Sequence, residues 1–467
     1  MADKLYKIHA VDNVRVNLGD NMKYACRNIK KGEEIIKYGF PIGVAKEDIK
    51  EGEKVHVHNI RSLLEGKSGY IEFKPFTDTT KKTDGGTFLG YRRKNGKVGV
   101  RNDIVIIPTV GCVNGICESL SRKTGAVAYL HPYGCSQLGG DHESTRKILR
   151  GLALHPNVGG ALIVSLGCEN NTPESFRELL DQWGYDENRI RFMTVQNESD
   201  ELRKGEELIG ELKAIAAKDK RVKCPVSELI VGLKCGGSDA LSGITANPLV
   251  GLASDKLASV GASSVLTEIP ESFGAENVLL ARCKDKSVYD ALSHMMDDFK
   301  AYYIAHGERI DENPSPGNKA GGISTLAEKS LGCVQKGGSS AVTGVVEYGE
   351  RVTEKGLSVL NGPGNDIVAC TALSAAGAHI ILFTTGRGTP LGSAVPVIKI
   401  STNSSLSERK GNWIDFNAGR LLDEGADKNK IAEELYSLIL QTAEGKLTAS
   451  EKNGFHEIAI WKNGVTL

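Results

Sequence analysis

Short apolar runs recur between residues 98 and 403, and each ends in glycine, cysteine or asparagine. Stretches with helical spacing, such as 144–155 and 199–219, lie between these runs. Alternation of buried strands with helices is typical of an α/β fold with a mostly parallel sheet. Ligands bind such sheets beyond the carboxyl ends of the strands, so we expect the polar residues that follow these runs to form the functional site. Examples of the runs are NDIVIIPTVGC (102–112), GALIVSLGCEN (160–170), SELIVGLKCGG (227–237) and AGAHIILFTTGRG (376–388).

The first 75 residues have a different pattern. They contain short, alternating, β-branched segments broken by glycine, namely KIHAVDNVRVNL (7–18), EEIIKYG (33–39) and GYIEFK (69–74). Short strands with frequent turn signals predict a compact β domain. Residues 76–97 are rich in Thr, Lys and Gly and have no period, which predicts a linker.

The size and charge of the chain limit the class of protein. Its 467 residues suggest three domains, at roughly 150 residues each. Lys and Arg number 58, and Asp and Glu also number 58, so the formal net charge is zero. This balance argues against a protein that coats nucleic acid or an anionic membrane, and we expect neither as a partner. The 54 glycines predict many tight turns and close backbone approaches.

The N-terminal sequence and the cysteines bear on location. Charges at Asp3, Lys4 and Lys7 leave no apolar signal core. No apolar stretch is long enough to span a membrane. The ten cysteines include no CxxC pair, which favours free thiols or thiolate ligands over structural disulfides. We therefore expect a cytoplasmic protein.

Three loops between 109 and 171 gather side chains that can bind a metal or move a proton. TVGCVNG (109–115) places a cysteine in a strand-to-helix turn, where helix amides favour a thiolate. HPYGCSQLGGDH (131–142) is the densest group of possible ligands, although its spacing fits no standard zinc module. LGCENN (166–171) puts a cysteine and a glutamate at a strand tip, followed by amides that can bind oxygen atoms. The alternative in each case is a plain turn with capping side chains or a small buried cysteine.

Further loops follow in the second half of the chain. LKCGGSDALSG (233–243) is a glycine-rich turn whose backbone N–H groups can hold a carboxylate or phosphate. Lys319 in ENPSPGNKAGG can hold a carboxylate or act as a base, the alternative being a solvated lysine. Arg387, between two glycines, is suited to clamp a carboxylate. The other motifs are SLGCVQKGGSS (330–340) and GPGND (362–366).

Taken together, these motifs make the chain similar to the altronate/galactarate dehydratase family over essentially its whole length. The resemblance implies a β-clip (SAF-like) domain at 1–75, a linker at 76–97, an α/β middle domain at 98–228 and a Rossmann-like C-terminal domain with a mostly parallel sheet at 229–467. It is carried by KIHAVDNVRV, IKYGFPIGVA, VHVHN, NGKVGVRN, PTVGCVNG, YGCSQLG, LGCENN, CGGSDALSGITANP, NPSPGNKAGG, PGND, TGRGTP and HEIAIWKNGVTL.

The resemblance also implies an activity. It implies a hydro-lyase that dehydrates a small-molecule sugar acid with a divalent metal, with Fe²⁺ as the expected cofactor and Mn²⁺ as the alternative. With D-altronate as the substrate, the product is 2-dehydro-3-deoxy-D-gluconate, a step in hexuronate catabolism. The family further implies a homodimer.

Dehydration of a 2,3-dihydroxy acid makes defined demands on the residues. A base must remove the weakly acidic proton at carbon 2, and an acid must protonate the hydroxyl that leaves carbon 3. A metal ion can stabilise the negative charge that gathers on the carboxylate, as in enolase-type sites. Thiolate ligands favour iron or zinc over magnesium.

Placement at strand ends then assigns the candidate residues. The expected metal ligands are Cys112, His131, Cys135, Cys168, Cys235 and Cys333. The expected catalytic residues are His142, Lys319, Glu169 and Asp239. The expected substrate-binding residues are Asn170, Ser238, Arg387, Asn365 and Asp366.

Other functions fit parts of this pattern. Within the family, the chain could be a galactarate dehydratase or a lyase that expels sulfite from sulfolactate. A nucleotide-binding oxidoreductase is a second alternative, but Pro390 and the β-like AVPVIKI deny TTGRGTPLG the helix that a dinucleotide loop needs. A third alternative is a sugar-acid sensor that binds without turnover.

Overall fold

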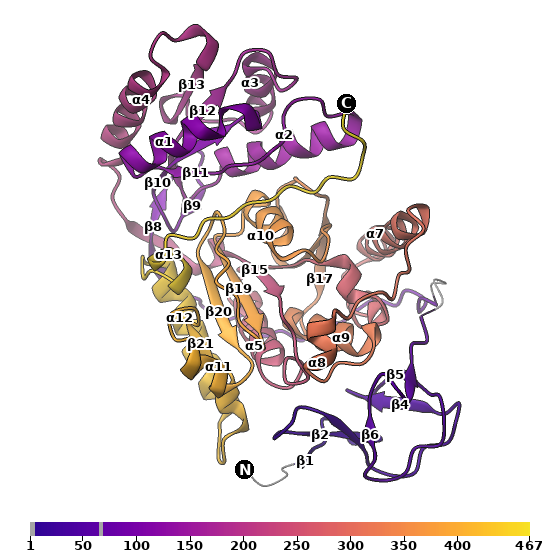
Figure 1. The fold of residues 1–467 in the computed structure, drawn as a ribbon. Coiled ribbons are helices and arrows are strands. Elements are labelled where there is room, and N and C mark those ends of the chain that lie inside the picture. The colour runs from indigo at the N-terminus through magenta and orange to yellow at the C-terminus, as the bar shows by residue number, and fades with distance from the viewer. Residues whose placement is uncertain (1–4, 65–68) are drawn as a thin grey trace.

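A computed structural model describes residues 5–64 and 69–467. Asp3 and Lys4 therefore lie outside the described residues. The chain forms a small N-terminal β domain, a middle α/β domain and a larger C-terminal α/β domain (Figure 1). Among the described residues, no helix is long and apolar enough to cross a membrane.

Two small antiparallel sheets make up the N-terminal domain, as the alternating pattern predicted. Ile29, Ile35, Ile42 and Ile49 are almost fully buried between them, so the β-branched residues form the core of this domain. One sheet has the order β1-β2-β3-β6, from Leu5–Tyr6, Val14–Asn17, Lys23–Ala25 and Lys54–Val55. The other has the order β4-β5-β7, from Glu34–Lys37, Phe40–Ala45 and Ile60–Arg61.

The segment after this domain differs from the prediction in two places. GYIEFK at 69–74 forms no strand. Within the expected linker, β8 (Thr87–Arg92) pairs antiparallel with β14 (Val222–Pro225) and with β9 (Val98–Gly99). The linker prediction is therefore wrong for 87–92. Phe88 is 1 % exposed, and burial of its apolar side chain stabilises a strand that the Thr- and Lys-rich composition of 76–97 did not indicate.

The middle domain has a four-stranded parallel sheet in the order β11-β10-β12-β13. Helices α1 and α4 pack on one face of the sheet, and α2 and α3 pack on the other. In chain order the elements are β10 (Asp103–Pro108), α1 (Asn114–Thr124), β11 (Val127–Ala128), α2 (Gly139–Ala153), β12 (Val158–Ser165), α3 (Pro173–Asp181), β13 (Ile190–Thr194) and α4 (Glu201–Ala216).

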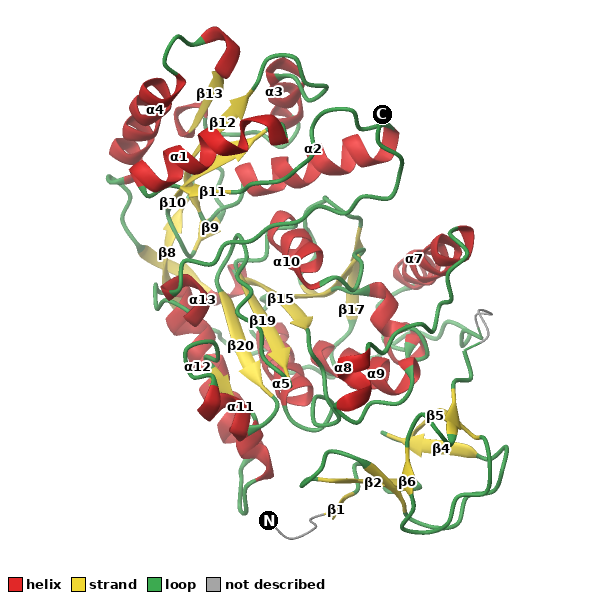
Figure 2. Cartoon of the chain, viewed as in Figure 1, coloured by secondary structure: helices red, strands yellow, loops and turns green. Residues whose placement is uncertain are grey.

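A seven-stranded parallel sheet forms the C-terminal domain, in the order β17-β18-β16-β15-β19-β20-β21. Helices α5 and α12 contact one another on one side of this sheet, and α10 packs toward α2 of the middle domain (Figure 2). The strands are β15 (Ile230–Cys235), β16 (Ser263–Leu266), β17 (Val342–Val346), β18 (Gly356–Leu360), β19 (Ile380–Thr385), β20 (Val397–Ser401) and β21 (Phe416–Asn417). The helices are α5 (Ala246–Ser259), α6 (Glu276–Leu280), α7 (Lys286–Ala305), α8 (Pro316–Ala320), α9 (Leu326–Cys333), α10 (Asp366–Ala375), α11 (Ser404–Arg409), α12 (Lys428–Ala443) and α13 (Ala449–Lys452).

The two α/β domains meet at the amino ends of their strands. Asn157 and His379, which precede β12 and β19, are joined by a hydrogen bond of 3.1 Å from Asn157 Nδ2 to the His379 carbonyl. His155 Nε2 lies 3.1 Å from the Ala378 carbonyl oxygen, and the two histidine rings contact edge to face. The middle and C-terminal sheets extend to opposite sides of this junction (Figure 2). Their carboxyl ends therefore face away from one another.

Buried charges attach the N-terminal domain to the C-terminal domain. Lys37 Nζ on β4 lies 2.8 Å from Glu328 Oε1, and Lys23 Nζ on β3 lies 2.9 Å from Glu328 Oε2. All three side chains are at most 1 % exposed. Glu328 belongs to α9, which follows the loop that holds Lys319, so the β domain supports one wall of the region described next.

Candidate functional site

A cleft of about 770 Å³ opens at the carboxyl ends of the C-terminal sheet. The turn after β15, the loop around α8, the start of α10 and the turn after β19 form its walls. Figure 1 shows α8 and α9 beside the end of β15. Charged residues of the lining are Glu271, Glu312, Lys319, Lys329, Asp366 and Arg387.

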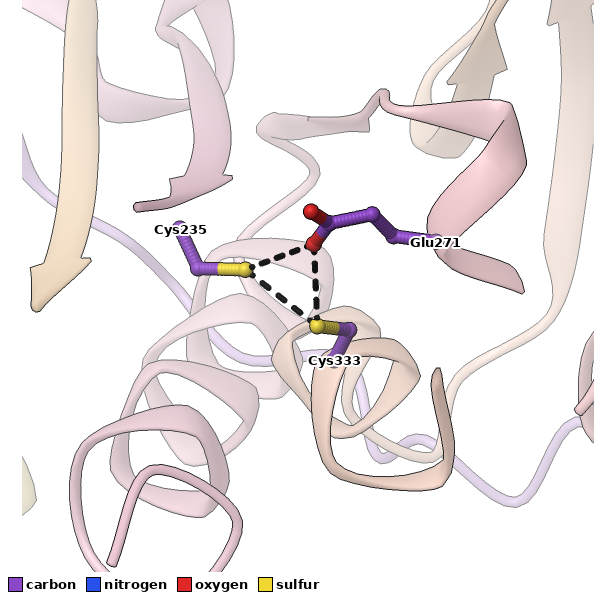
Figure 3. A group of neighbouring side chains, drawn as sticks. All are labelled: Cys235, Glu271 and Cys333. Carbon is purple, nitrogen blue, oxygen red and sulfur yellow. Dashed lines mark hydrogen bonds between the residues drawn. The ribbon is translucent and has the colours of Figure 1, made fainter. Parts of the chain in front are cut away.

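Two thiols and a carboxylate meet beneath this cleft (Figure 3). Cys235 Sγ at the end of β15 lies 3.3 Å from Cys333 Sγ at the end of α9. Each sulfur lies 3.2 Å from Glu271 Oε2. All three residues are buried, and their ligand atoms lie within 4.8 Å of one another. They form the one group of three such donors found among the described residues.

Local backbone geometry brings Glu271 to this position. The chain leaves β16 through Glu268, whose φ of 71° is left-handed, and then enters a short 3-10 helix over Ile269–Ser272. Non-glycine residues adopt this conformation only where surrounding contacts compensate its cost. Here Glu268 Oε2 accepts a hydrogen bond of 3.1 Å from the Cys235 amide, which fixes the turn against the end of β15.

Three lysines surround the trio. Lys329 Nζ lies 2.7 Å from Glu271 Oε1 and 3.2 Å from Asn313 Oδ1. Burial alone would raise the pKa of Glu271, but the positive charges of Lys329, Lys234 and Lys336 lower it to about 2. Burial alone would also lower the pKa of Lys336, yet nearby Cys235 and Cys333 raise it above its ordinary value. The carboxylate is therefore ionised at neutral pH and available as a ligand.

The two thiols share a proton unequally. A hydrogen bond with Cys333 lowers the pKa of Cys235 to about 6, against the opposing effect of burial, and Lys336 and Lys234 act in the same direction. The same hydrogen bond, together with burial, raises the pKa of Cys333 well above its ordinary value. The environment thus favours one thiolate and one thiol, and a cation between them would favour two thiolates.

Lys234 connects the trio to the cleft. Its Nζ contacts Glu268 Oε1, lies 2.7 Å from Asp366 Oδ1 and donates to the Cys235 carbonyl at 2.7 Å. Burial opposes its charge, but Glu268 and Asp366 raise the pKa of Lys234 well above its ordinary value. The predicted substrate residue Asp366 is therefore already paired, and it orients the lysine beneath the cleft.

Several predicted residues do line the cleft. Arg387 Nη1 donates to the Gly317 carbonyl at 3.1 Å, which ties the turn after β19 to α8. Lys319 on α8 has no ion-pair partner among the residues that the structure describes. Asn365 lines the cleft and caps α10 by accepting from the Val368 amide at 3.2 Å. Arg387 can thus offer a positive charge to a carboxylate, and Lys319 can offer a second one or, as the neutral amine, act as a base.

Ser238 and Asp239 lie deeper than predicted. Asp239 is 5 % exposed, and its carboxylate accepts hydrogen bonds from Ser242, Thr402 and the Leu241 amide. Burial raises its pKa. These contacts hold the CGGSD turn together, and the catalytic role of Asp239 stays a prediction. Ser238 is also buried, and its Oγ has no hydrogen-bond partner among the described residues.

The remaining predicted residues gather in the middle domain, at the carboxyl ends of β10, β11 and β12. Because that edge faces away from the cleft, a single metal shell that joins these residues to Cys235 and Cys333 does not form among the residues that the structure describes. The residues concerned are Cys112, His131, Cys135, His142, Cys168, Glu169 and Asn170.

Three of these residues have other roles. His131 is buried. Its Nε2 lies 2.8 Å from the Pro108 carbonyl oxygen, and its Nδ1 accepts a hydrogen bond from the Tyr133 amide. Both ring nitrogens therefore already have partners, and neither is free to bind a metal in this arrangement. The Glu169 carboxylate accepts from Thr109 Oγ1 and from the backbone of 166 and 167, so it stabilises its own loop. His142 lies on α2, away from Lys319, and burial lowers its pKa.

Sequence reasoning assigned no role to five charged residues that complete the site, although it noted one of them, Lys336, beside Cys333. Their common signal is a charge within or directly after an apolar run, as in IVGLKC and SSVLTEIPE, where burial must be compensated by a partner. They are Lys234, Glu268, Glu271, Lys329 and Lys336.

Three family models match successive segments of the chain. The altronate/galactarate dehydratase SAF domain matches residues 7–63, the D-galactarate dehydratase/altronate hydrolase second domain matches 90–217, and the D-galactarate/altronate dehydratase C-terminal domain matches 226–466. The chain belongs to the D-galactarate/altronate dehydratase family.

Individual relatives agree with this assignment. The chain is 48% identical to the altronate dehydratase of Bacillus subtilis, over 99% of this chain and 95% of that protein. It is 47% identical to the altronate dehydratase of Escherichia coli, over 99% of both chains. The galactarate dehydratase (L-threo-forming) of Escherichia coli is 32% identical, over 96% of this chain and 95% of that protein.

Proposed function

We propose that this chain is a hydro-lyase that removes water from D-altronate and forms 2-dehydro-3-deoxy-D-gluconate. Full-length identities of 48% and 47% to two altronate dehydratases support this substrate over galactarate, for which the identity is 32%. The observation that carries the proposal is the buried Cys235–Glu271–Cys333 trio beneath a cleft lined by the cationic side chains Lys319, Lys329 and Arg387.

The trio fits a divalent iron. Two sulfurs and one carboxylate oxygen give a donor set that suits Fe²⁺ and fits Mn²⁺ poorly, since Mn²⁺ prefers oxygen ligands. Buried thiolates are costly without positive charge nearby; Lys329 and Lys336 supply such charge here, and a cation between the sulfurs would add to it. When bound, the iron would supply Lewis acidity to the carboxylate end of the sugar acid.

The chain's own residues position the substrate. Arg387 uses one N–H group on the Gly317 carbonyl, which leaves further donors of its fork for the substrate carboxylate. Asn313 and Asn365 line the same cleft and can donate to sugar hydroxyls. Lys319 is our candidate for the group that takes the proton from carbon 2, because it lines the cleft and has no ion-pair partner among the described residues.

A substrate panel tests this proposal. The protein would be reduced, loaded anaerobically with Fe²⁺ and assayed for 2-oxo acid formation from D-altronate, galactarate and sulfolactate. We expect turnover of D-altronate that a chelator abolishes. Preference for galactarate or sulfolactate would contradict the substrate assignment, and tight binding without any turnover would identify a sensor.

Two further predictions concern the cell and the assembly. We infer a cytoplasmic homodimer, as expected for a metabolic enzyme of this family. Light scattering on the full chain, with a monomer mass of 50.1 kDa, tests the dimer. A mass near that of one chain would contradict it.

A further inference from the structure

The middle domain carries a second concentration of thiols that the dehydration site does not use. Of the ten free cysteines, six are buried and one is half-buried. The three exposed ones are Cys112, Cys135 and Cys168. Free cysteine is ordinarily a buried residue, so three exposed thiols in one region require an explanation.

These three cysteines occupy equivalent positions on neighbouring strands. Cys112 follows β10, Cys135 follows β11 and Cys168 follows β12. The sheet order is β11-β10-β12 and the pairing is parallel, so the three strand ends lie at one edge. This is the edge at which α/β sheets bind ligands.

Contacts among the loops hold the three positions together. The Gly111 amide donates to the Tyr133 carbonyl at 2.8 Å, which joins the first loop to the second. The Ser136 amide donates to Asn170 Oδ1 at 2.9 Å, which joins the second loop to the third. Gly134 has a φ of 104°, and a Cβ there would lie 1.9 Å from the Thr109 carbonyl oxygen, so the backbone next to Cys135 must be glycine for the loops to approach.

Unused polar atoms surround these loops. Among the described residues, the fully buried Asn171 leaves its Oδ1 without a partner, the buried Gln137 leaves its Nε2 without one, and the half-buried Asn114 leaves its Oδ1 without one. An unsatisfied buried polar atom is costly, and Gln137 Nε2 is a donor from which the sulfur of a bound group could accept a hydrogen bond. The C-terminal tail closes one side, because the Leu467 amide donates to the Ser136 carbonyl at 3.1 Å.

Among the described residues, the three thiols do not converge closely enough to form the shell of one ion, because no three metal donors at this edge lie within 4.8 Å of one another. Iron and sulfide atoms between thiolates keep the ligands of a cluster farther apart than those of one ion. Cysteine thiolates are the usual ligands of such clusters. The positive end of α1, which begins just after Cys112, favours the negative charge of a thiolate-bound cluster.

We propose that Cys112, Cys135 and Cys168 bind an iron–sulfur cluster at the carboxyl edge of the middle sheet. Three protein thiolates leave at least one iron of a four-iron cluster without a cysteine ligand. That iron is open to an exogenous oxygen ligand, because all three cysteines are exposed.

The test is anaerobic reconstitution of the full chain with Fe²⁺ and sulfide, followed by desalting. Iron, acid-labile sulfide and the visible absorption spectrum would be measured for the wild type and for C112S, C135S and C168S. We expect the wild type to hold sulfide together with iron, and each variant to lose most of both the sulfide and the visible absorption. Because the three side chains are exposed, the variants should retain the wild-type circular dichroism.

Two matched variants keep the result specific. C26S alters the half-buried cysteine of the N-terminal domain, and C235S alters the dehydration site. Both should keep the sulfide and the visible absorption. The proposal is overturned if the wild type holds no labile sulfide, if C168S holds as much as the wild type, or if C235S alone loses it. The sulfide readout does not depend on D-altronate turnover, so failure of the proposed dehydration would leave this test intact.

Discussion

Replacement of Glu328 by glutamine should release the N-terminal β domain from the C-terminal domain. Glu328 is the carboxylate that pairs with both Lys23 and Lys37, at 2.9 and 2.8 Å. Burial alone would raise the pKa of Glu328, but the two lysines lower it to about 2, so the carboxylate is ionised at neutral pH. Glutamine keeps the size of the side chain and removes the charge that offsets two buried ammonium groups.

The size of the effect follows from burial. All three side chains are at most 1 % exposed, so solvent screens the charges little. Removal of one partner from a buried ion pair costs about 3–5 kcal/mol. Native-state hydrogen exchange measures the opening of the interface directly, and each 1.4 kcal/mol corresponds to about a factor of ten in exchange. We expect the amides of β3 and α9 to exchange about two to three and a half powers of ten faster in E328Q.

An exposed ion pair in the same domain provides the control. Lys30 and Asp48 pair at 2.8 Å with side chains 78% and 60% exposed. Solvent screens the charges of such an exposed pair, so D48N should exchange at nearly the wild-type rate. Equal exchange in E328Q and D48N would refute the argument that buried charge holds the domain in place.

Three other changes test separate parts of the structure. Burial lowers the pKa of His379 to about 4 in the folded protein, below its value in the unfolded chain. The unfolded chain therefore binds more protons as the pH decreases, and the free energy of unfolding should fall by about 2 kcal/mol between pH 7 and 5. Denaturant unfolding of H379Q should show a smaller pH effect, and an unchanged one would contradict this. R387K should raise the KM for D-altronate about tenfold through loss of the planar fork, whereas an unchanged KM would remove Arg387 from substrate binding. G134A should lower the Tm, because the added Cβ would lie 1.9 Å from the Thr109 carbonyl oxygen. G115A is the control and should keep the wild-type Tm, because a Cβ at position 115 meets open space. Equal Tm values for the two variants would contradict the close approach of the loops.

The apolar runs predicted the architecture well because a parallel sheet covered on both faces gives each strand a continuous apolar signature. That pattern places Cys235 and Arg387 at strand ends, and the structure brings both to the same cleft region. It could not reveal Glu271 or Lys329, which reach the site from a short 3-10 helix and from the interior of α9. Their role depends on which chain segments pack over the strand ends, and local sequence does not encode that packing.

The sequence pattern also could not predict the relative orientation of the two sheets. Strand-end placement is the same signal for Cys168 as for Cys235, so both were expected in one metal shell. Contacts of His155 and Asn157 with the segment around His379 join the domains at the amino ends of the strands instead. The strand-end residues are therefore divided between two edges, one with a buried trio and one with three exposed thiols.

D-Altronate turnover by the iron-loaded C333S variant tests the proposed dehydration site most directly. The matched control is C370S, because Cys370 is also fully buried in the C-terminal domain but lies on α10 outside the trio. We predict that C333S loses bound iron and 2-oxo acid formation, while C370S retains both. Wild-type turnover in C333S would contradict the assignment of the Cys235–Glu271–Cys333 trio as the centre of the reaction.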